Sequence, residues 1–282
     1  MTHPASIFRT KTNAVKELFG RTRAVIGVVH ALPLPGSPAY DGDPLERIYA
    51  HACSEARRYR DGGVDGVIVE NHGDIPFAKP DELGPETAAV MAVLTEAVRR
   101  ETGLPVGINV LANGAVAALA AAKAGGGSFV RVNQWANAYV ANEGFMEGKA
   151  GAATRYRAWL RARDVRIFAD VHVKHGAHAI VADRPLSELA RDAEFFDADA
   201  LIVTGQRTGD GANLEDLAAV RRSTKLPVLV GSGVTRENVG DIFRFADAVI
   251  IASALKHDGA WWNEVDPERV ADFMAVVRDL RA

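Results

Sequence analysis

Short runs of β-branched and other apolar residues alternate along the chain with longer amphipathic segments that have helical spacing. Such runs indicate buried strands, and strands that alternate with helices indicate right-handed βαβ units in a parallel sheet. We predict eight strands, at residues 24–30, 66–71, 105–111, 128–133, 166–174, 200–205, 227–233 and 248–253. Eight such units predict an α/β fold of the (β/α)8 TIM-barrel type, with an open doubly wound sheet as the alternative.

Residue types that favour helix starts follow several of these strands. Before the first long helix, Asp43 offers an N-cap, Pro44 a first helical residue and Glu46 a capping-box partner. Thr235 offers a cap after the seventh strand, and the segments "LGPETAA" and "VDPERVA" place proline in a first turn. We therefore expect a helix after each strand.

The chain shows no composition break, long linker or low-complexity segment, so we predict a single barrel domain over residues 24–282. Residues 1–23 are mildly basic and lack the long apolar centre of a secretory signal. We expect an N-terminal arm and a short helix there, with a targeting role as the alternative.

The overall composition argues against several classes of partner. The 282 residues carry a formal net charge of −3 and show no basic stripe, so we expect no nucleic-acid partner. No apolar run approaches the roughly 20 residues of a transmembrane helix, so we expect no integral membrane contact. The single cysteine, Cys53, cannot form an internal disulfide, which suits the cytoplasm. We expect a cytoplasmic homo-oligomer that acts on a small molecule.

Polar residues gather where the predicted strands end. In a TIM barrel these C-terminal ends carry the catalytic groups. The first four strands and the sixth end in or run into His30, Glu70, Asn71, His72, Asn109, Arg131, Asn133 and Thr204. The fifth strand ends in a triplet of ionisable residues, Asp170, His172 and Lys174.

The triplet is the strongest indication of chemistry. Alternate residues of a strand share a face, so we expect Asp170, His172 and Lys174 to point into the barrel together, within reach of Glu70 and Arg131. Together these groups offer proton donors and acceptors near neutral pH, so we predict that these five residues are catalytic. The alternative is a purely structural ion-pair network of the same side chains.

Small residues follow the last two strands. Gly231, Ser232 and Gly233 follow the seventh strand, and Ala252 and Ser253 follow the eighth. Loops at these positions, together with a helix N-terminus, form the usual phosphate site of such barrels. We predict that a phosphate binds between them; the alternative is a tight turn with no ligand.

A metal site is a further possibility, because several residue types at the strand ends can ligate metals: His30, Glu70, His72, Asp170 and His172. However, no His-x-His motif ends the first strand and no aspartate ends the eighth. Lys174, which is no ligand when charged, also lies among the histidines. We predict that neither a metal nor an organic cofactor is required.

Several longer motifs occur in order along the chain: "VIGVVHALPLPGSPAYDG", "DGVIVENHGDIPF", "GINVLANG", "VRVNQWANAYVANEGFMEGKAG", "DVHVKHG" and "VGSGVTRENV". In these motifs the chain resembles the BtpA/SgcQ family, from about residue 22 to the C-terminus. The resemblance implies a phosphate-binding TIM barrel. The family takes its name from a cyanobacterial factor needed to accumulate photosystem I, and other members lie in sugar-catabolic gene neighbourhoods.

The resemblance also implies a set of site residues. The family's motif positions fall here on His30, Glu70, Asn71, Asn109, Arg131, Asn133, Asp170, His172, Lys174, Gly231, Ser232 and Lys256. We predict that substrate is bound by His30, Asn71, Asn109, Asn133, Thr204 and Lys256. After the eighth strand the resemblance implies a Gly-Thr-like pair, and this chain has Ala252-Ser253, whose alanine Cβ narrows the approach to an anion.

Two functions fit these observations. The first is an enzyme that acts on a phosphorylated sugar or nucleoside-like compound by acid–base chemistry, as an isomerase, a lyase or a hydrolase that cleaves a glycosidic bond. The second, implied by the family name, is a non-enzymatic assembly or stability factor for photosystem I. Such a factor needs a partner-binding surface, for which Trp261 and Trp262 are candidates, although core packing is their expected use.

Overall fold

The strands of this computed structural model close into a barrel. The structure describes residues 11–205, 211 and 213–282, so residues 1–10 of the predicted arm lie outside it. Over the described residues eight parallel strands form the barrel: β1 (Ala24–His30), β2 (Gly66–Glu70), β3 (Val106–Asn109), β4 (Phe129–Val132), β7 (Arg166–His172), β8 (Ala200–Val203), β9 (Val228–Val230) and β10 (Ala248–Ile251). Because β1 pairs with both β2 and β10, the TIM-barrel prediction is confirmed and the open-sheet alternative is wrong.

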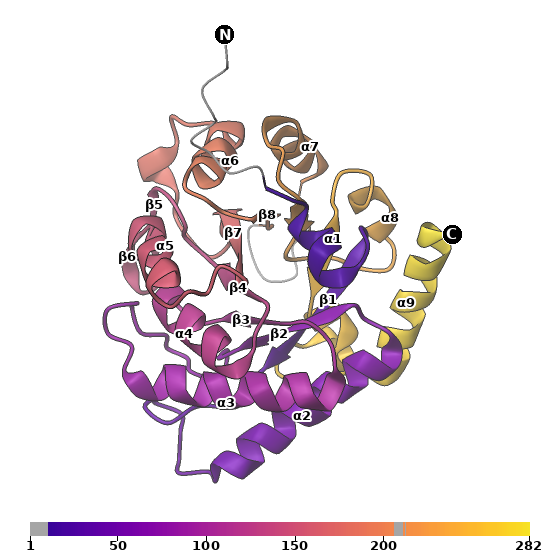
Figure 1. The fold of residues 1–282 in the computed structure, drawn as a ribbon. Helices are drawn as coiled ribbons and strands as arrows, with labels where there is room; N and C mark the ends of the chain where they lie inside the picture. Colours follow the sequence, from indigo (N-terminus) through magenta and orange to yellow (C-terminus); the bar gives the residue numbers. More distant parts are fainter. Residues whose placement is uncertain (1–10, 206–210, 212) are drawn as a thin grey trace.

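Helices surround this barrel (Figure 1). In the described part of the chain they are α1 (Ala14–Phe19), α2 (Leu45–Gly62), α3 (Pro85–Thr102), α4 (Ala115–Gly125), α5 (Ala150–Trp159), α6 (Leu186–Phe195), α7 (Leu214–Ser223), α8 (Val239–Ile242) and α9 (Pro267–Arg281), with short 3₁₀ turns η1 (Ala179–Val181), η2 (Ser253–Leu255) and η3 (His257–Gly259). None of the helices described here has both the length and the apolar character needed to cross a membrane.

Two of the predicted helix starts are wrong. α2 begins at Leu45 with Pro44 as its N-cap, and Asp43 instead pairs with Arg47 at 2.6 Å. α8 begins at Val239, four residues after the predicted cap at Thr235. The other proline signals are confirmed, because Pro85 and Pro267 are the first residues of α3 and α9.

A hairpin that we did not predict lies between β4 and α5. Its antiparallel strands are β5 (Ala138–Ala141) and β6 (Gly144–Glu147). Val140 of this hairpin also exchanges two backbone hydrogen bonds with Ala177, in the segment after β7. The hairpin therefore braces the segment that follows the triplet strand.

Alternate strand residues fill the interior of the barrel. On β1, Ala24, Ile26 and Val28 belong to an inner apolar cluster whose other barrel members are Ile68, Phe129, Phe168, Ala200, Ile202, Leu229, Ala248 and Ile250. Two residues beyond this cluster, the next inward positions on four strands hold polar side chains: His30, Glu70, Arg131 and Asp170. The barrel interior therefore changes from apolar to polar between one layer of side chains and the next, toward the C-terminal ends of the strands.

Helix α1 closes the opposite end of the barrel. Its residues Ala14, Val15 and Phe19 join the inner apolar cluster, and the rings of Phe19 and Phe129 meet edge to face with centroids 5.8 Å apart. A Cβ atom on Gly66 would lie 2.5 Å from the Phe19 ring, so glycine is required there. In the part of the chain that the structure describes, α1 therefore covers the N-terminal end of the barrel interior.

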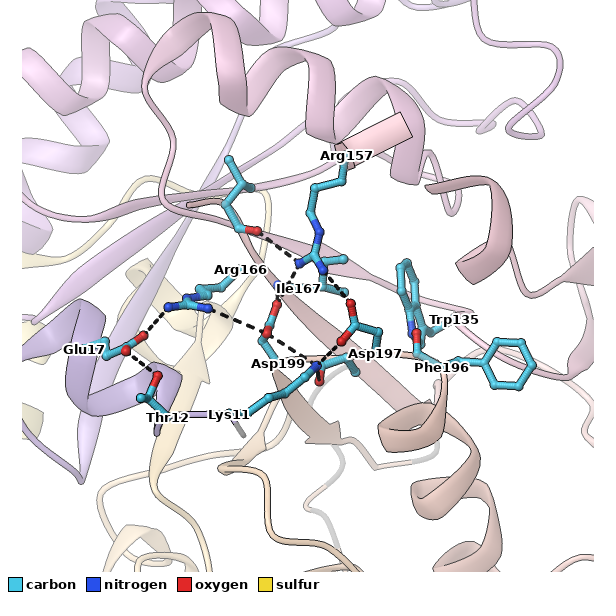
Figure 2. Close-up of polar contacts among 12 residues, drawn as sticks. Lys11, Thr12, Glu17, Trp135, Arg157, Arg166, Ile167, Phe196, Asp197 and Asp199 are labelled. Atoms are coloured by element: carbon cyan, nitrogen blue, oxygen red, sulfur yellow. Dashed lines mark hydrogen bonds and ion pairs between the residues drawn. The ribbon is translucent and has the colours of Figure 1, made fainter. Parts of the chain in front are cut away.

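A network of ion pairs ties strands together at the N-terminal end (Figure 2). Asp199, directly before β8, accepts hydrogen bonds of 2.9 Å from the Ile167 N–H of β7 and from Arg157 Nη1. Lys11 Nζ lies 3.5 Å from the same carboxylate. The acid therefore satisfies a backbone donor and a largely buried guanidinium together.

Asp65 and Asp247, directly before β2 and β10, each accept a backbone hydrogen bond from the preceding strand, as Asp199 does. Asp65 accepts a hydrogen bond of 2.7 Å from the Val25 N–H of β1, and Asp247 accepts one of 2.9 Å from the Val228 N–H of β9. In each case an acid before one strand holds the first residues of the preceding strand. These contacts fix neighbouring strands at the end away from the polar mouth.

We predict that Asp199→Ala lowers the free energy of unfolding by about 2 kcal/mol or more, because Arg157 loses its buried counter-charge, keeping the half-exposed Asp197, and the buried Ile167 N–H loses its acceptor. Urea denaturation measures the change. Asp164→Ala is the control, because Asp164 is a surface residue that pairs with Lys123 at 3.3 Å, and such pairs contribute less than about 1 kcal/mol. Equal losses for the two variants would contradict a stabilising role for the network.

Candidate functional site

A cavity of about 240 Å³ opens at the C-terminal ends of the barrel strands. Part of its lining is ionisable and comes from β1, β2, β4 and the residues after β2 and β7: His30, Glu70, His72, Arg131 and Lys174. Another part is formed by the turns after β9 and β10, residues 231–235 and 252–254. The structure thus brings charged groups and small-residue turns together around one cavity.

Glu70 supplies a carboxylate to the lining of this cavity. Its Oε2 atom accepts a hydrogen bond of 2.6 Å from Asn109 Nδ2, and its Oε1 atom lies 3.1 Å from His72 Nδ1. Burial alone raises the pKa of Glu70, but the contact with His72 and the positive charge of Arg131 outweigh burial and hold the pKa of Glu70 below its usual value. Glu70 is therefore ionised at neutral pH.

His30 is held in one orientation by the segment before α9. Its Nδ1 atom lies 3.0 Å from the carbonyl oxygen of Trp261, which can only accept, so Nδ1 carries the proton. Burial lowers the pKa of His30 to about 3, although Glu70 raises it. The ring is therefore neutral, and Nε2, which lies 3.9 Å from Glu70 Oε1, presents a lone pair. His30 also stacks on His72, with ring centroids 4.6 Å apart.

Arg131 and Asp170 form a buried ion pair. Arg131 Nε donates to one carboxylate oxygen of Asp170 at 3.1 Å and Nη2 to the other at 3.0 Å, while Asn133 Nδ2 donates at 3.3 Å. Burial raises the pKa of Asp170, and the Arg131 charge opposes this shift. For these two residues the geometry matches the ion-pair alternative, with Asp170 holding the Arg131 guanidinium at the cavity wall.

Lys174 follows β7 and lines the cavity. Burial and the Arg131 charge lower the pKa of Lys174, and the opposing effects of Glu70 and Asp170 are smaller. A lysine with a lowered pKa holds more neutral amine at a given pH, which suits proton transfer or nucleophilic attack on a carbonyl.

The prediction that His172 shares this cavity is wrong. Pairing shifts between Asp170 and His172, so that β7 uses two residues where β8 uses one, from Ile202 to Val203. This bulge breaks the two-residue alternation on which the prediction depended. His172 instead stacks on His178, with centroids 3.6 Å apart, and lines a second hollow of about 370 Å³.

Several residues predicted to bind substrate have other partners. Lys256 is buried outside the cavity lining, where Nζ lies 3.2 Å from Glu55 Oε2 and donates to the Asn263 carbonyl at 2.9 Å. Asn71 accepts a hydrogen bond of 2.7 Å from the Leu111 N–H and so joins two loops. The polar side chains of Lys256 and Asn71 therefore bond to other groups of the protein and do not line the cavity.

The other residues predicted to bind substrate, apart from His30, also bond to protein groups. Asn109 and Asn133 support Glu70 and Asp170, and Thr204 donates to the His172 carbonyl at 3.1 Å beside the second hollow. Of the residues predicted to bind substrate, His30 is the one found in the lining described for the main cavity. Asn109 and Asn133 are positioning residues for the groups that line it.

The turn after β9 is braced from one side. Asn238 Oδ1 accepts from the Thr235 N–H and Nδ2 donates to the Gly233 carbonyl, both at 2.8 Å. Gly233 has a φ of +62°, which favours glycine. The Gly231 N–H donates to Val203, and a Cβ atom on Gly231 would lie 2.7 Å from the Ile202 side chain. Thr235 thus contributes to the turn without capping α8.

Two ring-bearing residues of the cavity lining, His72 and Trp261, were not among the predicted site residues. His72 lies two residues after Glu70, so the shared face was visible in the sequence, where we considered it only as a metal ligand. Trp261 was expected in the core, yet it lines the cavity, and its ring meets the His72 ring edge-on with centroids 4.3 Å apart. Trp262 is 70% exposed.

Comparison with known proteins identifies relatives along most of the chain. The family model described as "BtpA family" matches residues 21–279. A protein of Archaeoglobus fulgidus is 45% identical over 88% of this chain and 96% of its own length. The photosystem I biogenesis protein BtpA of Synechocystis is 38% identical over 93% of this chain and 91% of its own length.

Among solved structures, the thiamine phosphate pyrophosphorylase of Pyrococcus furiosus has the same type of fold. The two structures superpose with a TM-score of 0.57, covering 96% of this chain and 100% of that protein. The sequence identity is 16%, so this likeness concerns the fold alone.

The amine of Lys174 should become reactive at lower pH than that of a surface lysine. Only the unprotonated amine is acylated, and a lowered pKa increases the unprotonated fraction. Competitive labelling with acetic anhydride across the alkaline range, followed by mass spectrometry, reports an apparent pKa for each lysine. Lys123, on the surface beside Asp164, is the internal control. An apparent pKa for Lys174 at or above that of Lys123 would contradict the electrostatic description of the site.

Proposed function

The chain belongs to the BtpA family, and we propose that it is an enzyme acting on a phosphorylated sugar or nucleoside-like small molecule by acid–base chemistry. One observation carries the proposal: ionisable groups from β1, β2 and β4 and the small-residue turns after β9 and β10 line the same cavity. A structural barrel would fill this layer with aliphatic side chains. Here the layer is polar, and its groups face a space large enough for part of a ligand.

The phosphate end of the substrate is assigned to the two turns. Residues 231–235 and 252–254 carry mostly small side chains, which let backbone groups approach an anion closely. Arg131 and Lys174 supply positive charge to the same cavity. Binding of the phosphate away from the reacting atoms would contribute binding energy that orients the substrate.

The reacting end is assigned to the opposite, ionisable side. Glu70 and His72, 3.1 Å apart, form a pair that can share and transfer a proton. Arg131, positioned by Asp170, and Lys174 would stabilise negative charge that develops on a substrate oxygen. These groups suit isomerisation, elimination or cleavage of a glycosidic bond.

The name of one relative favours a second function. The Synechocystis relative is called a photosystem I biogenesis protein, which suggests an assembly or stability factor. An archaeon also has a relative, and at higher identity. The polar cavity has no evident use in a factor that acts only through its surface, so the enzyme is the preferred proposal.

Three sequence-based predictions accompany this proposal. The division into an arm at residues 1–23 and one barrel domain, the homo-oligomeric state and the cytoplasmic location remain predictions.

The experiment that tests the proposed function is a thermal-shift screen of matched ligand pairs. Each phosphorylated sugar or nucleotide is compared with the same compound without phosphate. A specific ligand at ~100 times its Kd stabilises the folded state by about 2.7 kcal/mol, and we expect this only for phosphorylated members. If no phosphorylated compound raises Tm above its partner, the substrate class is wrong.

A charge placed in the proposed phosphate site should abolish anion binding. We expect Ser253→Asp to bind inorganic phosphate at least ~10-fold more weakly than Ser253→Asn, because two like charges about 4 Å apart repel by roughly 4 kcal/mol at an effective dielectric constant near 20. Isothermal titration calorimetry measures both affinities. The asparagine variant has nearly the same shape, so equal affinities would place the anion elsewhere.

A further inference from the structure

We infer that His30, Glu70 and His72 form a binding site for a divalent transition-metal ion, with Zn²⁺ as the best match. One ligand atom from each of the three residues lies within 4.8 Å of the ligand atoms of the other two. Two imidazoles and one carboxylate are a ligand set that zinc uses in catalytic sites. The inference does not depend on the proposed function, since metal binding is measured without substrate.

The register of the barrel creates this cluster. His30 of β1 and Glu70 of β2 are direct partners across neighbouring strands, and His72 follows two residues later. The sequence-based argument against a metal looked for two histidines on the first strand. The structure supplies one histidine from β1 and a Glu-x-His pair from β2 and the residues after it.

The orientation of His30 is the strongest argument for a cation. Its Nδ1–H group donates to the Trp261 carbonyl, so Nε2 is the ring atom that faces Glu70 Oε1, 3.9 Å away. Both atoms are of types that ligate metals, and the distance between them is longer than that of a direct hydrogen bond. A metal ion would satisfy both atoms together.

The spacing of the ligand atoms is close to what a metal requires. Around a tetrahedral ion with bonds of about 2.0–2.1 Å, ligand atoms lie roughly 3.3–3.5 Å apart. Glu70 Oε1 lies 3.1 Å from His72 Nδ1 and 3.9 Å from His30 Nε2. Small side-chain rotations would bring the three atoms to this spacing.

The outer contacts also match those of metal sites. Ligating histidines commonly donate their second N–H to a backbone carbonyl, and ligating carboxylates are commonly hydrogen-bonded themselves. His30 donates to the Trp261 carbonyl, and Glu70 accepts from Asn109 at 2.6 Å. Three protein ligands leave a coordination position for water or substrate, and all three residues line the cavity.

The test uses the full-length protein, stripped with a chelator and titrated with Zn²⁺ in a calorimeter and with Co²⁺ by visible spectroscopy. We expect one ion per chain and the d–d absorption of four- or five-coordinate Co²⁺. His72→Gln and the nearly isosteric Glu70→Gln should each weaken Zn²⁺ binding by ~100-fold or more, with circular dichroism confirming the fold.

His178→Gln is the matched control, because His178 is also part of a stacked histidine pair but lies in the second hollow. It should leave the stoichiometry and affinity unchanged. If the unsubstituted protein binds no ion at this site, or if His178→Gln weakens binding as much as His72→Gln, the inference is wrong. Loss of phosphate binding in Ser253→Asp, with metal binding intact, would separate this site from the proposed phosphate site.

Discussion

Arg131 carries a permanent positive charge into the barrel, and the C-terminal mouth is organised around it. A buried guanidinium needs a counter-charge and hydrogen bonds, which Asp170 supplies at 3.0 and 3.1 Å. The same charge helps to lower the pKa of Lys174 and to keep Glu70 ionised. The protonation states of two cavity groups, Lys174 and Glu70, therefore depend in part on this pair. An anionic ligand would add a further counter-charge to the same cavity.

The barrel supports this polar layer by concentrating its apolar packing at the other end. Phe129 and Phe168 stack directly below Arg131 and Asp170 on the same strands, with centroids 4.6 Å apart. Helix α1 closes that end, and Asp199 ties β7, β8 and α5 together there (Figure 2). A rigid base allows the opposite ends of the strands to hold charged groups in fixed positions, as catalysis and metal binding both require.

The sequence predicted the barrel well, because its strands are buried on both faces and read as apolar runs between helices. The two-residue period also predicted that Glu70, Arg131 and Asp170 share the interior. It failed where the backbone departs from that period, since the bulge before His172 depends on the partner strand. It also failed for Lys256, whose partner Glu55 is 201 residues away in the sequence. The role of Trp261 likewise depends on how the segment before α9 folds over His30, which no local pattern encodes.

In the proposed function, the cavity holds the phosphate group of a small substrate between the turns after β9 and β10. Crystals soaked in sodium tungstate, a phosphate mimic with a strong anomalous signal, test this directly. We expect an anomalous peak in the cavity between residues 231–235 and 252–254. Peaks found only at surface arginines, with none between these turns, would contradict it.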